Sequence, residues 1–135
     1  MKMRNAVLIL VGAAICAGLA LFRLPEQNDG IPAATAEERQ IYLFSQGFKG
    51  REETAQEITV PDTEDAIFAD YAALQEAQGL PLAAYAGQPA VQYVFRLEQS
   101  ELYAELLVSD GILIGAMCCD PAKHTMLRIN GKPFP

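Results

Sequence analysis

The pattern of hydrophobic and polar positions divides the chain into an apolar N-terminal run and a longer segment of mixed patterning. Residues 6–22 carry no charged side chain, Lys2 and Arg4 precede them, and Arg23 follows. A membrane-spanning helix needs about 17–25 apolar residues, whereas the apolar core of a secretory signal has about 7–15. The run therefore predicts an uncleaved membrane anchor within residues 1–24, with a cleaved signal as the alternative. In both cases we expect the rest of the chain to be exported, with the N-terminus held in the cytoplasm.

Residues 25–34 are rich in polar and turn-forming types, which predicts a linker between the anchor and a domain at 35–130. The domain opens with a helix, because Thr35 and Glu38 have the spacing of a capping box. Gly47 is expected to end this helix by taking a left-handed conformation, which would bring Phe48 back onto Leu43.

The side chains of this first helix predict which of its faces packs on the core. Ile41 and Phe44 lie at helical spacing and, with the neighbouring Leu43, are expected to form the apolar face of the helix. Arg39 and Gln40 are expected to point away from it.

A charged segment at residues 49–56 is expected to be an exposed loop, and residues 57–60 alternate polar and β-branched types as a short strand does. A second helix is predicted from Asp62 or Thr63 to Gly79. Four apolar residues form one stripe along it, Ile67, Phe68, Tyr71 and Leu74.

Strand patterns then follow one another to the end of the domain. Residues 90–98, 102–109 and 112–118 are predicted strands, and residues 124–129 are a candidate for another. The Asp110-Gly111 pair predicts a tight two-residue hairpin, and residues 131–135 are expected to be a flexible tail. The fold class expected is α+β: an N-terminal transmembrane helix, then two helices packed on one face of an antiparallel sheet of three to five strands.

Two runs of residues carry a family resemblance. They are Arg39-x-x-Tyr42-Leu43-x-x-x-Gly47-Phe48 with Ile58-x-Val60-Pro61, and Tyr71-x-x-Leu74-Gln75-x-x-Gln78-Gly79-Leu80-x-Leu82-x-x-Tyr85-x-Gly87. Together with Tyr93, the hairpin and Ile114-Gly115, they resemble domain-of-unknown-function family 4830 over nearly the whole exported domain. The resemblance implies an exported or membrane-anchored bacterial domain, typically Gram-positive, without an assigned activity or cofactor.

The chain departs from that family at polar positions. An asparagine usual after the helix tyrosine is Ala72, an aspartate is Pro81, and a Gly-Asp pair is Ala116-Met117. If those polar residues form a site in relatives, this chain has lost it, and the matching residues are those of folding.

Charge narrows the possible partners. All seventeen acidic residues lie from Glu26 onward, against seven basic ones in the same part of the chain, so the exported part carries a net charge near −10. Such a balance argues against nucleic acid and anionic lipid as ligands. The membrane contact expected is the one made by residues 6–22.

One cluster of residues could form the catalytic site of a thiol-dependent enzyme. Cys118, Cys119, Asp120 and His124 contain the residue types of a thiol nucleophile, its base and an orienting carboxylate. Because adjacent residues of a strand point to opposite faces, we favour the interpretation that the cysteines pack as small hydrophobic side chains. Vicinal cysteines also lack the spacer of a tetrahedral zinc site, and a strained vicinal disulfide is the remaining alternative.

A group of glutamates and a group of tyrosines are the other candidates for a functional site. Glu98, Glu101 and Glu105 could be paired acids of a glycosidase but are interpreted as a solvated hairpin edge. A second group could line a groove but is interpreted as half-buried core: Tyr71, Tyr85, Tyr93 and Tyr103.

The sequence therefore predicts no catalytic, metal or cofactor site. It predicts a single-pass membrane-anchored, extracytoplasmic domain, or a secreted one if the N-terminal segment is cleaved, that binds an unknown protein or cell-envelope ligand. The alternatives are a thiol-dependent enzyme that uses Cys118 or Cys119 with His124, and a purely structural envelope protein.

Overall fold

The computed structural model describes residues 30–62, 65–66 and 68–135. The predicted anchor at residues 6–22, and with it the question of cleavage, falls outside these residues. Within them, no helix has the length and apolar character needed to cross a membrane.

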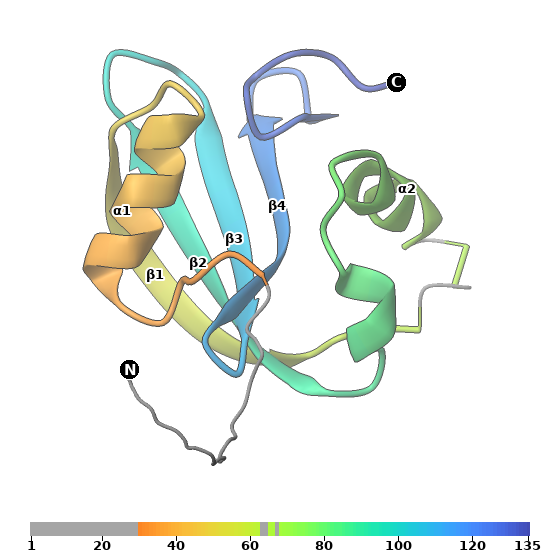
Figure 1. Cartoon of the computed structure of the whole chain (residues 1–135). Helices are drawn as coiled ribbons and strands as arrows, with labels where there is room; N and C mark the ends of the chain where they lie inside the picture. The colour runs from red at the N-terminus through yellow and green to blue at the C-terminus, as the bar shows by residue number, and fades with distance from the viewer. Residues whose placement is uncertain (1–29, 63–64, 67) are drawn as a thin grey trace, which may run out of the picture. The chain divides into compact units, whose positions relative to one another are not determined.

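The described residues form an α+β domain whose sheet has five antiparallel strands in the order β1-β2-β3-β4-β5. The elements follow one another as α1 (Ala36–Ser45), β1 (Gly50–Thr59), α2 (Ala69–Ala77), η2 (Leu82–Tyr85), β2 (Pro89–Leu97), β3 (Tyr103–Ser109), β4 (Ile112–Asp120) and β5 (Thr125–Leu127). Figure 1 shows α1 lying across the strands and α2 lying beside β4. The predicted fold class is confirmed in this form, with β3 at the centre of the sheet.

The hairpin between β3 and β4 forms as predicted. Asp110 and Gly111 have φ angles of 54° and 79°, and Ser109 pairs with Ile112 across the turn. Both turn residues therefore adopt the left-handed conformation that a two-residue turn of this kind requires.

The first strand is longer than predicted. β1 begins at Gly50 and pairs with β2 along its whole length, so the loop expected at residues 49–56 is wrong. The charged residues fit a strand because β1 lies at the edge of the sheet, and a β-bulge at Glu53 interrupts its register. Charges and bulges are the usual means by which an edge strand avoids pairing with another molecule.

The two faces of the sheet carry separate clusters of buried side chains. Neighbouring residues of a strand point to opposite faces, and Leu106 and Leu107 of β3 belong to different clusters. Tyr42 and Leu43 of α1 join the cluster of Leu106, whereas Tyr71 of α2 packs against the cluster of Leu107. The prediction that both helices cover one face is therefore wrong, because α1 covers one face and α2 with η2 covers part of the other.

Both helices end by the same device. The N–H of Phe48 donates to the Leu43 carbonyl oxygen, and the N–H of Leu80 donates to the Gln75 carbonyl oxygen, each at 3.0 Å. Gly47 and Gly79 have φ angles of 96° and 76° at the position before. These are Schellman closures, as the sequence predicts.

Two glutamines of α2 take the place of a neighbouring strand along part of β4. Gln75 Oε1 accepts the N–H of Ala116 at 2.8 Å, and Gln78 Nε2 donates to the Ala116 carbonyl oxygen at 2.9 Å. Gln78 Oε1 also accepts the N–H of Ile129 at 2.8 Å. Because β5 pairs with residues 118–120 of β4, these side chains satisfy backbone groups of β4 that lie beyond its reach.

The C-terminal residues, expected to be a flexible tail, make contacts with the domain. Pro133 forms an isolated bridge with Leu127, and the N–H of Arg128 donates to the Lys132 carbonyl oxygen at 2.9 Å. The Arg128 guanidinium also lies 5.1 Å from the centre of the Phe134 ring.

Candidate interaction surface

Helix α1 presents a different face to the sheet from the one its apolar pattern predicts. Arg39, Tyr42 and Leu43 are buried, whereas Ile41 is 62% exposed and Phe44 is 72% exposed. The predicted buried face is thus correct for Leu43 and wrong for Ile41 and Phe44, and the prediction that Arg39 points away is also wrong. Arg39, Tyr42 and Leu43 have the i, i+3, i+4 spacing of one helix face, which leaves Ile41 and Phe44 facing outward.

The buried Arg39 guanidinium donates hydrogen bonds to a carboxylate and to two backbone carbonyl oxygens. Its Nε donates to Glu52 Oε1 at 2.9 Å, and its Nη1 donates to the carbonyl oxygens of Ala33 and Ala34 at 3.0 Å each. The guanidinium carbon lies 3.7 Å from the centre of the Tyr93 ring. A buried charge is tolerated when it is paired and hydrogen-bonded in this way.

Arg39 therefore joins three parts of the domain beneath α1. Glu52 belongs to β1, Tyr93 belongs to β2, and Ala33 and Ala34 belong to the segment that enters the helix. The capping box holds the same end of the helix, because Glu38 Oε1 accepts the N–H of Thr35 at 3.1 Å and Thr35 Oγ1 accepts the N–H of Glu38 at 3.1 Å. Together these bonds fix how α1 is rotated about its axis.

The outward face of α1 is an apolar ridge between two hollows, which we call the α1 ridge and define by Ile41 and Phe44. A hollow of about 350 Å³ lies on one side, lined in part by Ile31, Pro32 and Tyr42. A hollow of about 400 Å³ lies beside Phe44 and is lined in part by Phe48, Lys49 and Glu98. Ile41 and Phe44 are the two large hydrophobic side chains that the described residues leave exposed.

The charges near the ridge are mostly acidic. Glu37 is exposed one helical turn before Ile41, Glu38 lines the first hollow, and Glu98 lines the second. Lys49 is the basic residue among the described residues that line the hollows.

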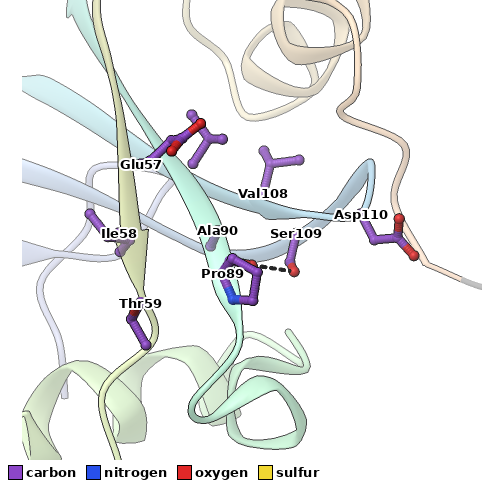
Figure 2. Close-up of a pocket in the computed structure, with 9 residues that line it drawn as sticks. Glu57, Ile58, Thr59, Pro89, Ala90, Val108, Ser109 and Asp110 are labelled. Atoms are coloured by element: carbon purple, nitrogen blue, oxygen red, sulfur yellow. Dashed lines mark hydrogen bonds between the residues drawn. The ribbon is translucent and has the colours of Figure 1, made fainter.

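A separate pocket of about 590 Å³ lies where β1 ends, β2 begins and β3 ends. Figure 2 shows Val108 in its wall, with the carboxylates of Glu57 and Asp110 at its margin. The Ser109 hydroxyl donates to the Pro89 carbonyl oxygen at 2.8 Å, drawn as a dashed line in Figure 2. No histidine, lysine or arginine is among the described residues that line this pocket, and the Ser109 hydroxyl gives its hydrogen bond to a backbone carbonyl oxygen rather than to a side-chain base.

The two cysteines of the predicted cluster lie on opposite faces of β4 and are free thiols. The Cys118 thiol is buried among the side chains under α1 and donates to the Ile129 carbonyl oxygen at 3.3 Å. Burial raises the pKa of Cys118 to about 12. Cys119 is half-buried on the other face, where burial and the nearby Glu105 and Asp120 carboxylates raise its pKa.

Asp120 and His124 are not brought to either thiol by hydrogen bonds in the described part of the chain. Asp120 Oδ1 accepts the N–H groups of Ala122 at 3.0 Å and Lys123 at 3.4 Å, which orders the turn after β4. His124 is exposed in that turn with a φ angle of 53°. The described residues contain no group of three His, Cys, Asp or Glu side chains placed to hold a metal ion.

The carboxylates of the hairpin between β2 and β3 do not converge on a cleft. Glu98 and Glu101 are exposed, whereas Glu105 is half-buried and accepts a hydrogen bond from Gln92 Nε2 at 2.8 Å. Burial raises the pKa of Glu105.

The tyrosines are also separated. Tyr71 and Tyr85 pack against the cluster of Leu107. Tyr93 lies under Arg39, and the Tyr103 ring centre lies 4.9 Å from the guanidinium carbon of Arg96. The four therefore do not line one groove.

The burial of Arg39 differs from the prediction, which rests on side-chain polarity alone. The available signal was the i, i+3, i+4 spacing of Arg39, Tyr42 and Leu43, together with glutamates in the strand that follows. An arginine at such a spacing can be buried if a carboxylate reaches it.

Comparisons with protein-family models, curated proteins and solved structures found no match to this chain. The resemblance to domain-of-unknown-function family 4830 stays a prediction.

Proposed function

We propose that this chain is an exported, membrane-anchored interaction module that docks a helix of a partner protein on the α1 ridge. One observation carries the proposal: α1 exposes Ile41 and Phe44 while it buries the charged Arg39. A soluble domain gains free energy by the opposite arrangement. Departures of this kind from the expected pattern occur where a surface has a function.

The shape of the surface favours a helix as the docked element. Ile41 and Phe44 are spaced i, i+3 along α1, and a hollow lies on each side of them. Packed helices insert the side-chain ridge of one into the groove of the other. An amphipathic helix recognised in this way contributes apolar side chains at i, i+3, i+4 and i+7.

The charge around the surface favours basic residues on the docked helix. Glu37, Glu38 and Glu98 flank the ridge, against Lys49. Complementary charges raise the rate of association and exclude partners of the wrong sign. We therefore infer an apolar stripe with Lys or Arg beside it.

The anchor proposed at residues 6–22 would hold this surface outside the cell membrane. The apolar run, the flanking Lys2, Arg4 and Arg23, and the family resemblance support that placement. The raised pKa of Cys118 and its hydrogen bond to Ile129 favour interaction over thiol catalysis at that residue.

The test uses a synthetic helical peptide with leucines along one stripe and lysines beside it. We expect the full chain to bind this peptide, measured by fluorescence anisotropy, and to bind a version with glutamates in place of lysines more weakly. Substituting both Ile41→Ser and Phe44→Ser should weaken binding about 30-fold, as loss of side chains worth about 2 kcal/mol implies. The double substitution changes no charge, so general attraction to an acidic protein is unaffected.

Ala77→Gln is the matched control, since Ala77 is exposed at the end of the other helix. Equal binding by the double variant and the wild type would contradict the proposal, as would failure of the wild type to bind the lysine peptide. Sedimentation of the chain without peptide is the second arm. If the wild type is a dimer and the double variant is a monomer, a second copy of this chain binds the α1 ridge. That result would overturn the proposal of a basic helix from a partner protein.

A further inference from the structure

Three sulfur-bearing residues occupy neighbouring strand positions on the sheet face opposite α1. Cys119 of β4 pairs directly with Met126 of β5, and Met117 lies two residues before Cys119 on the same strand. Cys118, between them, is buried under α1, so Met117 and Cys119 point to the other face. Leu127 packs with Cys118, which places Met126 on the face of Cys119.

These three side chains are half-buried, and all three belong to the described domain. Methionines on a sheet face are ordinarily covered by another layer of the core. Tyr71, Tyr85 and Phe68 cover the part of this face around Leu107, and the sulfur-bearing residues lie outside that cluster.

The backbone spacing lets the three sulfur atoms meet. Side chains directly opposite one another in an antiparallel pair have Cβ atoms about 4.5–5.5 Å apart. Residues two apart on a strand are separated by about 6.6–6.8 Å. Methionine has three rotatable bonds and adapts its thioether position readily, so Met117 and Met126 can both turn towards Cys119.

We propose that Met117, Cys119 and Met126 form a binding site for Cu(I). Thiolate and thioether sulfurs are soft donors, and soft donors select Cu(I) over magnesium, calcium or manganese. The site differs from the metal sites that His, Cys, Asp and Glu build, because two of its donors are uncharged thioethers. It is independent of the proposed α1 docking surface, which lies across the sheet.

Binding follows a simple balance. The Cys119 thiol gives its proton to solvent, and its sulfur and the two thioether sulfurs each donate an electron pair to the copper ion. The oxidation state of copper does not change. One thiolate and one monovalent cation leave no net charge at a half-buried position, and Glu105 and Asp120 are the carboxylates near Cys119.

The experiment titrates the reduced full chain anaerobically with Cu(I) against the chromophoric chelator bathocuproine disulfonate. We expect one copper ion per chain, and X-ray absorption of the loaded protein should show a first shell of three sulfurs. Cys119→Ser should abolish the site. Met117→Leu and Met126→Leu should each weaken it by more than the 10- to 100-fold, roughly, that loss of an outer-shell partner costs.

Cys118→Ala is the matched control, because it removes the neighbouring thiol from the opposite face and should leave copper affinity unchanged. Methionine and leucine have similar volumes, so the two Met→Leu variants should fold, which circular dichroism checks. Copper affinity unchanged in both of them would overturn the site even if Cys119 mattered, since binding would then be to a single thiol. Equal affinity of Cys119→Ser and wild type would overturn it outright.

Discussion

The two helices of this domain end alike but are held to the sheet by opposite means. Each closes on a glycine with a left-handed backbone, Gly47 and Gly79. Beneath α1, a charged Arg39 reaches strands β1 and β2. Along α2, two uncharged glutamines, Gln75 and Gln78, bond to the backbone of β4.

The way in which each helix is bonded to the sheet determines which of its side chains are exposed to solvent. Gln75 is fully buried and Leu74 beside it is fully buried too, so α2 hides polar and apolar groups together at the sheet edge. Burying Arg39 turns α1 so that Ile41 and Phe44 face outward. A helix fixed by one buried charge can therefore keep an apolar surface available, and this is the property that the proposed function uses.

Removing the arginine should have the largest effect. Arg39→Met would leave Glu52 and the carbonyl oxygens of Ala33 and Ala34 without their partner, so we expect the free energy of unfolding to fall by about 2–4 kcal/mol. Urea unfolding of the full chain measures it. Arg51→Met is the control, because the Arg51 side chain is 73% exposed and should contribute little. Equal losses in the two variants would contradict the role given to Arg39.

Removing a glutamine of α2 should have the next effect. Gln75→Ala leaves the buried N–H of Ala116 without its acceptor and opens a cavity, so we expect a loss of about 2–3 kcal/mol. Amide hydrogen exchange at Ala116 should accelerate in the same variant. Gln40→Ala on α1, where Nε2 donates to the Gly50 carbonyl oxygen at 2.7 Å in a half-buried position, should cost less than Gln75→Ala. A larger loss of stability for Gln40→Ala than for Gln75→Ala would contradict the role given to the α2 glutamines.

The contact between α2 and β4 can be probed at one hydroxyl. A Cβ at Gly115 would lie 2.8 Å from Tyr71 Oη, and that buried hydroxyl has no hydrogen-bond partner among the described residues. Gly115→Ala should therefore cost about 1–3 kcal/mol, and Tyr71→Phe should restore most of it. Tyr71→Phe alone should be neutral or stabilising, since it removes an unsatisfied polar group. Additive effects in the double variant would contradict the close approach.

A smaller effect should appear with pH on the sheet face away from α1. Burial raises the folded-state pKa of Glu105 above its unfolded value, so stability is lost as the pH rises through that range and the group ionises. Glu105→Gln keeps a partner for Gln92 and cannot ionise. We expect its advantage over the wild type to be absent at pH 3 and present at pH 7 in urea unfolding. An advantage that shrinks as the pH rises would show the opposite linkage.

Local signals predicted the parts of this fold that depend on neighbouring residues. The capping box of Thr35, the two glycine closures and the Asp110-Gly111 hairpin all form as the sequence indicates. Each of these features is formed by residues within a few positions of one another, so the local sequence is enough to predict it.

The errors concern partners that are distant along the chain. The charges of residues 49–56 predict an exposed loop, but residues 50–56 extend the predicted strand at 57–60 into β1 by pairing with β2, about forty residues later in the chain. The helical pattern alone places Arg39 outside, because the Glu52 and Tyr93 side chains that contact it come from other elements. The exposure of Ile41 and Phe44 depends on the burial of Arg39. A prediction that places Arg39 outside therefore also misses the surface proposed to bind a partner.

That rotation is tested most directly by the stability of the Ile41→Ser, Phe44→Ser double variant. If both side chains face solvent, urea unfolding of the full chain should give a free energy within about 0.5 kcal/mol of the wild type. If α1 instead buried its apolar pair and exposed Arg39, losing two core side chains would cost about 4 kcal/mol or more. A loss of that size would contradict the orientation of α1 and the docking surface built on it.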